Sequence, residues 1–367
     1  MRSFEGLFGH RPTVVRDAPG RVNLIGEHTD YNGGFVLPMA IPQRTRVELA
    51  PQPDCLVRVW SASFPSTGPL EYSLGEETSG RGWLDYVQGV TDVLRKAGYA
   101  PSGFDARIES SVPLGSGLAS SAALEVSLLR ALRSAFTLAL EEVELARLGQ
   151  RAENEFVGAR VGIMDQMAAS LAEAGEALFV DTRDLSYQRV PLPADAEIAV
   201  ISSGIAHSNV AGEYNARRAE CKRACALLGV GQLRDLATAD LGRVEALPEP
   251  LGRRARHVIT ENERVLAAVE AMKAGDLRRL GELFYASHAS MRDDYQVSIL
   301  EIDLMVELAS AEPNVFGARL TGGGFGGSVV VLVRAGWAAD LADRIARGYA
   351  ERTGRSPAVL MPAPGAV

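Results

Sequence analysis

The sequence predicts a protein of mixed helices and strands that is divided into two domains. Its 367 residues are enough for two domains, each with a core of its own. Strand-like and helix-like patterns recur in both halves of the chain. The stretch from Asp184 to Ala194 is polar, contains prolines and separates two strand-like segments. We therefore expect a first domain over residues 1–185 and a second over residues 186–367.

The composition is ordinary for a soluble globular protein, with 47% hydrophobic and 23% charged residues. The net charge of −8 argues against a general partner of nucleic acids or anionic membranes, although a local pocket can still bind ATP. No apolar run approaches the roughly 20 residues that span a bilayer. Residues 1–5 lack the apolar core of a signal peptide, and the three cysteines are sparse. We therefore expect a cytoplasmic location.

The most informative stretch is Pro113–Ala122, which is rich in glycine and serine. Residues 104–109 alternate between apolar and polar and predict a strand before it, and Leu124, Leu128 and Leu132 mark one face of a helix after it. The first turn of such a helix has unpaired N–H groups and a partial positive charge, which together bind phosphate well. A strand-to-helix turn with serine caps is the other interpretation. A Walker-type site is not indicated, because no lysine follows the glycines.

Four ionisable residues crowd into ten positions near the amino terminus: Arg21, Glu27, His28 and Asp30. Apolar residues on both sides suggest that these groups are partly enclosed. Carboxylate, imidazole and guanidinium groups at this spacing suit a sugar, whose hydroxyls form paired hydrogen bonds with them. A charged surface loop is the alternative.

The remaining elements follow from periodicity. Strands are expected over 45–49 and 56–60, and a helix over 86–97 with Trp83 just ahead of it, either as a core anchor or as a flat wall for a nucleobase. In the second half we expect strands over 177–181, 197–202, 315–320 and 329–333, and helices over 213–228, 253–273, 276–286, 299–309 and 337–352.

Two carboxylates occupy notable helical positions. A helix is expected over 141–157, and Glu153 lies at the rim of its apolar face, where an unpaired charge is costly. A divalent cation or a salt bridge to a nearby arginine would satisfy it. A second helix begins near Ile163 and places Asp165 in its first turn. In the first turn, the carboxylate either stabilises the helix by interacting with the helix dipole or points at a reacting hydroxyl.

The run Thr321–Ser328 contains five glycines among six residues. Glycine in such number costs backbone entropy, so the turn requires positive φ angles or a very close approach of another backbone.

Several of these stretches resemble one family, in chain order. Gly20–Tyr31 is nearly identical to the galactokinase signature, whereas Pro113–Ala122 and Thr321–Ser328 resemble the second and third motifs of the GHMP kinase superfamily. The segment Gly162–Gln166, and His207-Ser208 followed by Glu213-Tyr214, also resemble galactokinases. The similarity extends from about residue 17 to residue 333.

This resemblance implies an α+β fold in two lobes. The N-terminal lobe would be like domain 2 of ribosomal protein S5 and the C-terminal lobe ferredoxin-like, with the active site in the cleft between them. The implied activity is ATP-dependent phosphorylation of the anomeric hydroxyl of galactose, with ATP and Mg²⁺ as cofactors.

The resemblance also implies roles for individual residues. Asp165 would be the catalytic carboxylate and Arg21 its charged neighbour. The sugar pocket would be lined by Glu27, His28, Asp30, Gly162 and Tyr214. The phosphates would be bound by Gly115, Ser116, Gly117, Leu118, Ala119, Ser120 and Ser121, with Trp83 near the adenine, and the metal would be bound by Ser121 and Glu153. Ala119 departs from many relatives, which have a third serine there, but Ser120 and Ser121 remain.

Two other functions stay open at this point. One is a kinase for another sugar, such as N-acetylgalactosamine or arabinose. The 2-position separates these sugars, and the sequence does not show how much room the pocket leaves there. A sensor that binds sugar and ATP without catalysis is a different class, but Asp165, Arg21, Ser121 and Glu153 are all present. We expect galactose and ATP as the ligands and a monomeric protein.

Overall fold

The computed structural model describes residues 2–65, 68–205 and 210–361, and these form two compact units. Unit 1 takes in the described residues of Met1–Arg21, Ile41–Leu114 and Leu118–Leu171, and unit 2 those of Val22–Ala40, Gly115–Gly117 and Ala172–Val367. The units interleave, because two short segments from the first half of the chain belong to unit 2. The domain boundary expected between residues 185 and 186 stays a prediction.

Unit 1 is built on a twisted sheet. Its strands are β1 (Val14–Asn23), β3 (Pro38–Pro51), β4 (Leu56–Ser61), β5 (Leu70–Ser73) and β6 (Phe104–Ser110), of which the last two residues of β1 and the first three of β3 count in unit 2. β3 and β6 pair antiparallel, β6 and β4 pair parallel, and β4 and β5 pair antiparallel. The expected strands over 45–49, 56–60 and 104–109 are therefore confirmed.

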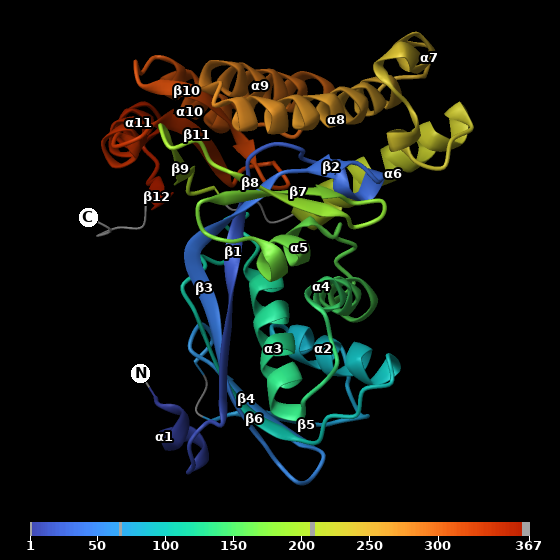
Figure 1. Cartoon of the computed structure of the whole chain (residues 1–367), viewed down its shortest axis with the longest axis vertical. Coiled ribbons are helices and arrows are strands. Elements are labelled where there is room, and N and C mark those ends of the chain that lie inside the picture. The colour runs from blue at the N-terminus through green and yellow to red at the C-terminus, as the bar shows by residue number, and fades with distance from the viewer. Residues whose placement is uncertain (1, 66–67, 206–209, 362–367) are drawn as a thin grey trace. The chain divides into compact units, whose positions relative to one another are not determined.

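Helices cover one face of this sheet (Figure 1). They are α2 (Leu84–Lys96), α3 (Ser120–Phe136), α4 (Glu142–Arg151) and α5 (Met164–Leu171), while α1 (Phe4–Phe8) lies near the amino terminus. Apolar residues of β3, β4 and β6 form one core with those of α2 and α3, including Phe104, Leu94 and Leu128. The single helix expected over 141–157 is wrong in one respect, because Ala152–Val157 is a π-helix. Local periodicity does not distinguish a π-turn from the α-helix that it continues.

Unit 2 contains a four-stranded antiparallel sheet. In spatial order its strands are β10 (Val315–Thr321), β11 (Ser328–Arg334), β9 (Ala196–Ser202) and β12 (Ala358–Met361). Three further strands are β2 (Phe35–Val36), β7 (Glu176–Asp181) and β8 (Tyr187–Pro191). Both β2 and β8 pair antiparallel with β7. β8 lies in the polar stretch where the sequence indicated a linker. Only Val190 within it is buried, so an apolar pattern was lacking.

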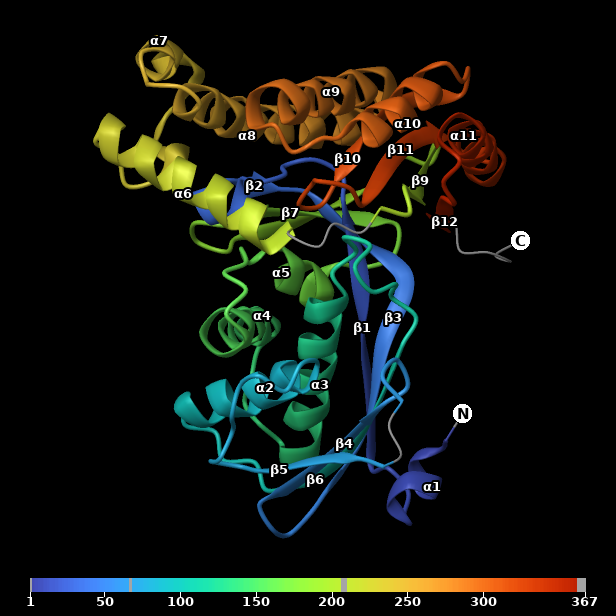
Figure 2. The same cartoon turned by 180° about the vertical axis from the view of Figure 1, so that it is seen from behind.

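The helices of unit 2 pack on the four-stranded sheet and on one another. They are α6 (Val210–Leu228), α7 (Leu241–Glu245), α8 (Leu251–Ala274), α9 (Leu277–Ser290), α10 (Leu300–Ser310) and α11 (Ala338–Thr353), with a π-helix over Met291–Tyr295. The long helices α8 and α9 lie side by side in both views (Figures 1 and 2). The helices expected in this half are confirmed, with ends that differ by a few residues. Within the described ranges, none of the helices has both the length and the apolar character needed to cross a bilayer.

Helix α8 binds the loop that follows β1. The Glu261 carboxylate accepts from the backbone N–H of Gly26 at 2.9 Å, and the Asn262 side chain accepts from the N–H of Phe35 at 2.9 Å. His257 places Nε2 3.2 Å from the carbonyl oxygen of Glu27 and therefore donates to it. Three side chains of one helix thus satisfy backbone groups of this loop and of Phe35, the first residue of β2.

Burial controls the protonation of His257. Its side chain is fully buried, and this desolvation lowers the pKa of His257 from its ordinary value of 6.5 to about 4. The neutral ring is the form that the folded protein stabilises. Between pH 6.5 and pH 4 the unfolded chain binds a proton at this position that the folded chain does not bind. The contribution to stability is therefore complete above pH 6.5 and is lost as the pH falls toward 4.

We predict that His257→Gln, which keeps a donor near the Glu27 carbonyl, reduces the pH dependence of stability. Relative to this variant, the parent protein should lose about 2 kcal/mol of unfolding free energy between pH 7.5 and pH 5. Urea unfolding at the two pH values measures the difference. If the unfolding free energies of the two proteins changed equally with pH, the pKa of His257 would be the same in the folded and unfolded states, which would contradict the prediction.

Candidate active site

The glycine- and serine-rich stretch forms the turn that its composition predicts. Gly115 and Gly117 adopt left-handed conformations with φ angles of 68° and 76°, which favour glycine. Ala119, with a φ angle of 60°, immediately precedes α3, which begins at Ser120. Ser120 and Ser121 therefore lie in the first helical turn, where backbone N–H groups have no partner within the helix. The turn therefore joins left-handed glycines to a helix start, while the anion site expected there stays a prediction.

The third glycine-rich motif supports this turn within unit 2. The Ser328 hydroxyl donates to the carbonyl oxygen of Ser116 at 3.0 Å. A Cβ atom at Gly322 would meet the carbonyl oxygen of Gly117 at 3.3 Å, and Gly322 itself has a φ angle of 87°. The glycine at position 322 is thus required both by its conformation and by the close approach of the turn. The two motifs form one packed structure rather than two separate sites.

Arg21 and Asp165 form a bidentate ion pair in unit 1. Arg21 Nε donates to Asp165 Oδ1 at 2.8 Å, and a terminal nitrogen of Arg21 donates to Oδ2 at 2.7 Å. The Arg21 side chain is 6% exposed and that of Asp165 is 27% exposed, so the carboxylate is still accessible. A paired fork of this kind fixes the orientation of a carboxylate as well as its charge. The pair, whose residues are far apart in sequence, was predicted as neighbours.

Two further carboxyl groups, those of Glu153 and Glu125, lie near this pair. The Ser121 hydroxyl hydrogen bonds to Glu153, and burial together with the charge of Asp165 raises the pKa of Glu153 to about 7. Gln166 Nε2 donates to Glu153 at 2.8 Å and to Glu125 at 3.0 Å, and thereby joins the two carboxyl groups. Glu125 is fully buried, which raises its pKa well above the ordinary value. The carboxyl groups of Asp165, Glu153 and Glu125 thus lie close together, and Arg21 pairs with the first of them.

Glu27, one of the residues predicted for sugar binding, forms several hydrogen bonds within unit 2. One of its carboxylate oxygens accepts from the backbone N–H of Gly322 at 2.8 Å, and the other accepts from Arg319 at 2.7 Å and from the side chain of Asn23. Glu27 is 2% exposed and Arg319 is fully buried. Burial raises the pKa of Glu27, although Arg319 and Gly322 oppose this effect. In this structure the carboxylate holds the third motif against the signature loop.

His28 lies among aromatic side chains of unit 2. Its backbone is left-handed, with a φ angle of 63°, and its carbonyl oxygen accepts from Asn32 at 2.8 Å. The ring centroid of His28 lies 5.5 Å from that of Tyr214 on α6. Asp30 accepts from the backbone N–H of Tyr31, and it is only half-buried. Three of the residues predicted for the sugar pocket, His28, Asp30 and Tyr214, therefore come from one small region of unit 2.

The other predicted residues have distinct surroundings. Gly162 belongs to unit 1, where it is buried in the loop before α5. Trp83 lies just before α2, and its ring is parallel to that of Phe64 at a centroid distance of 5.9 Å. His207 and Ser208, which also match the family, lie outside the described residues. The roles assigned to all of these residues stay predictions.

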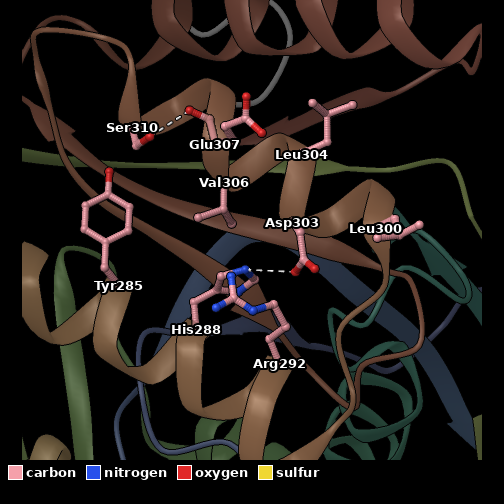
Figure 3. Close-up of a pocket in the computed structure, with 9 residues that line it drawn as sticks. All are labelled: Tyr285, His288, Arg292, Leu300, Asp303, Leu304, Val306, Glu307 and Ser310. Carbon is pink, nitrogen blue, oxygen red and sulfur yellow. Dashed lines mark hydrogen bonds and ion pairs between the residues drawn. The ribbon is translucent and has the colours of Figure 1, made fainter.

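Unit 2 also has a cavity that contains none of the predicted residues (Figure 3). It has a volume of about 410 Å³ and is lined by residues of α9 and α10 together with Arg292. His288 and Asp303, which both line it, contact each other directly, with Nε2 and Oδ1 3.1 Å apart. Arg292 forms an ion pair with Asp293 and Glu307 with Arg352, so these charged groups already have partners.

Sequence reasoning missed several residues on which the site depends. Arg319 is the one charged residue in the strand Val315–Thr321 and is fully buried there, and that anomaly was a usable signal. Glu125 lies next to Leu124 in a helix with a clear apolar face, which was a similar signal. The partners of these residues are distant in sequence, so no local pattern identifies them.

Family models match three parts of the chain. Residues 2–51 match the galactokinase galactose-binding signature, residues 85–173 match the N-terminal domain of GHMP kinases, and residues 268–352 match their C-terminal domain. Together these matches include the Gly20–Tyr31 signature and the glycine-rich motifs that the sequence indicated. The α+β fold of the GHMP kinases is confirmed.

Individual relatives extend the similarity to almost the whole chain. The galactokinase of Chloroflexus aurantiacus is 48% identical over 99% of this chain and 95% of its own length, and that of Streptomyces coelicolor is 44% identical with the same coverage. The crystal structure of Lactococcus lactis galactokinase complexed with galactose aligns with a TM-score of 0.92 and 36% identity, over 97% of this chain and 95% of that one. Methanococcus jannaschii mevalonate kinase shares the fold at 18% identity, with a TM-score of 0.68 and coverage of 96% and 98%. The chain therefore belongs to the galactokinase family of GHMP kinases.

Proposed function

We propose that this protein transfers the γ-phosphoryl group of ATP to the anomeric hydroxyl of galactose, which yields galactose 1-phosphate and ADP. The observation that carries the proposal is the accessible Asp165 carboxylate, oriented by Arg21, in a chain that is 48% identical to a galactokinase over nearly its full length. A cytoplasmic location and a monomeric state belong to the same proposal.

Asp165 acts on the proton of the reacting hydroxyl. A bond forms between the anomeric oxygen and the γ-phosphorus while the bond from that phosphorus to the oxygen of ADP breaks. The hydroxyl proton passes to the Asp165 carboxylate as the sugar oxygen loses its charge to phosphorus. Arg21 keeps the carboxylate aligned through its two hydrogen bonds. The N–H groups at the start of α3 and the Gly115–Ser121 turn bind the phosphates.

The residues near Glu153 fit a magnesium ion. Ser121 and Glu153 provide two oxygen ligands within hydrogen-bonding distance of each other, and one oxygen of the buried Glu125 has no hydrogen-bond partner among the described residues. No group of three or more candidate ligand side chains is found in the part of the chain that the structure describes. Mg²⁺ commonly uses one or two protein oxygens and completes its shell with water and phosphate, so two ligands are sufficient. When bound, the ion would neutralise phosphate charge.

Release of ADP over a panel of sugars tests the proposed activity. Galactose, N-acetylgalactosamine and arabinose are supplied separately with ATP and Mg²⁺, and the product is identified by ³¹P NMR. Turnover with galactose and a 1-phosphate product support the proposal. Turnover with another sugar alone would reassign the substrate, and tight binding of galactose and ATP without ADP release would indicate a sensor.

We predict that Asp165→Asn lowers kcat for galactose by about 10²- to 10⁴-fold, because the variant retains the shape of the side chain but loses its proton acceptor. Calorimetry should show galactose and an ATP analogue still binding, since Asn can hydrogen bond to the same hydroxyl. A kcat within about tenfold of the parent value would contradict the role of Asp165.

We also predict that Glu153→Gln weakens the binding of Mn²⁺, a spectroscopic substitute for Mg²⁺, by about 10- to 100-fold. Electron paramagnetic resonance of the protein with ADP and Mn²⁺ measures this without turnover. Glu155→Gln is the matched control, because Glu155 lies on the same π-helix but is 45% exposed and pairs with Arg151. Equal Mn²⁺ affinity in the two variants would remove Glu153 from the metal site.

A further inference from the structure

Gln166 connects helix α5 to the two buried glutamates of unit 1. It directly follows Asp165 near the start of α5, and its side chain is fully buried. Its amide nitrogen donates to Glu153 at 2.8 Å and to Glu125 at 3.0 Å. Glu153 is 5% exposed and Glu125 is fully buried, so both hydrogen bonds are shielded from solvent. One amide group therefore joins the π-helix, α3 and α5.

The chemistry of its partners fixes the orientation of this amide. An ionised carboxylate has only acceptor atoms, whereas a glutamine amide has two N–H donors on its nitrogen and an acceptor oxygen. Only the nitrogen can hydrogen bond to both carboxylates, and it has one hydrogen for each. These hydrogen bonds favour the charged forms and oppose the rise in pKa that burial causes at Glu153 and Glu125.

The hydrogen bond from Gln166 restricts the carboxylate of Glu153. Ser121 also hydrogen bonds to Glu153, but Ser121 is itself a proposed metal ligand. Gln166 is thus a partner of Glu153 that stays outside the proposed metal site. Hydrogen bonds from such neighbours orient metal ligands, and the loss of one typically lowers metal affinity by about 10- to 100-fold.

Glu125 holds the amide of Gln166 from the side of α3. It lies one helical turn after Ser121, which places the two side chains on the same face of that helix. The path from Ser121 along α3 to Glu125, and from there through Gln166 to Glu153, therefore connects the two proposed metal ligands. This path constrains the spacing between them.

We propose that Gln166 is a positioning residue that holds the Glu153 carboxylate in place for a divalent cation bound together with the nucleotide. This role rests on the proposed function, which includes the metal site. Gln166 acts through Glu153 and does not itself bind the cation. Because Gln166 directly follows Asp165, the start of α5 would serve both the reacting hydroxyl and the metal.

The binding of Mn²⁺ measures this role without turnover. Gln166→Met keeps the length of the side chain and removes both donors. We expect it to weaken the binding of Mn²⁺ in the presence of ADP by about 10- to 100-fold, as measured by electron paramagnetic resonance. Gln150→Met is the matched control, because Gln150 on α4 of the same unit donates to the backbone carbonyl of Val161 at 3.3 Å. It should leave the affinity for Mn²⁺ unchanged.

A double-mutant cycle separates positioning from a general loss of stability. If Gln166 acts through Glu153, adding Gln166→Met to the Glu153→Gln variant should change the affinity for Mn²⁺ by no more than about twofold. An unrelated structural effect would weaken binding by the same factor in both backgrounds. Urea unfolding checks that each variant is folded. Gln166→Asn, which keeps the amide on a shorter side chain, replaces Gln166→Met in the cycle if the latter does not fold.

The outcomes distinguish this role from the proposed function. Equal Mn²⁺ affinity in the parent and in Gln166→Met overturns the positioning role, whether or not galactose is phosphorylated. Equal losses with and without Glu153→Gln, or a loss in Gln166→Met when Glu153→Gln alone has no effect, overturn the action through Glu153. The expected affinities together with no ADP release on galactose would establish the role of Gln166 and would count against the galactokinase activity alone.

Discussion

The buried ion pair between Glu27 and Arg319 is the interaction on which the organisation of unit 2 depends. Arg319 is fully buried, and it donates to the carbonyl oxygen of Leu24 at 2.9 Å and to Glu27 at 2.7 Å. Glu27 in turn accepts from Gly322. A charge so deep in a protein is costly unless nearly all of its hydrogen-bonding capacity is used. The requirement to satisfy both charges therefore fixes the signature loop and the third glycine-rich motif in one arrangement.

In unit 1, by contrast with the paired charges of Glu27 and Arg319, two buried glutamates lie close together. Asp165 is neutralised by Arg21, but Glu153 and Glu125 are held together through Gln166 with no cation of comparable proximity described for them. Burial raises the pKa of both glutamates, and the charge of Asp165 adds to this for Glu153 as that of Glu153 does for Glu125, so the charged forms are poorly stabilised. Under the proposed function, a divalent cation at this position would relieve that cost. The net charge of −8 therefore says little about ligands, because local groups determine what binds.

Much of the fold around the glycine- and serine-rich stretch could be predicted from the sequence, because these elements depend on local patterns. The alternation over residues 104–109 and the leucine spacing after it defined β6 and α3, and the glycines between them required the conformations that are observed. The π-helix after Arg151 and strand β8 could not be predicted in the same way. The first continues a helical pattern without a break, and the second has too few buried residues to show an alternation.

The sequence by itself determined the family, the order of the motifs and the candidate residues for the chemistry, because these lie in short contiguous segments such as Gly20–Tyr31. Only the tertiary structure decided how those residues are held. Arg319 lies 292 positions from Glu27, and Tyr295 lies 264 positions from Tyr31. Hydrogen bonds between groups so far apart follow from the packing of whole elements, and no periodicity within a segment encodes them.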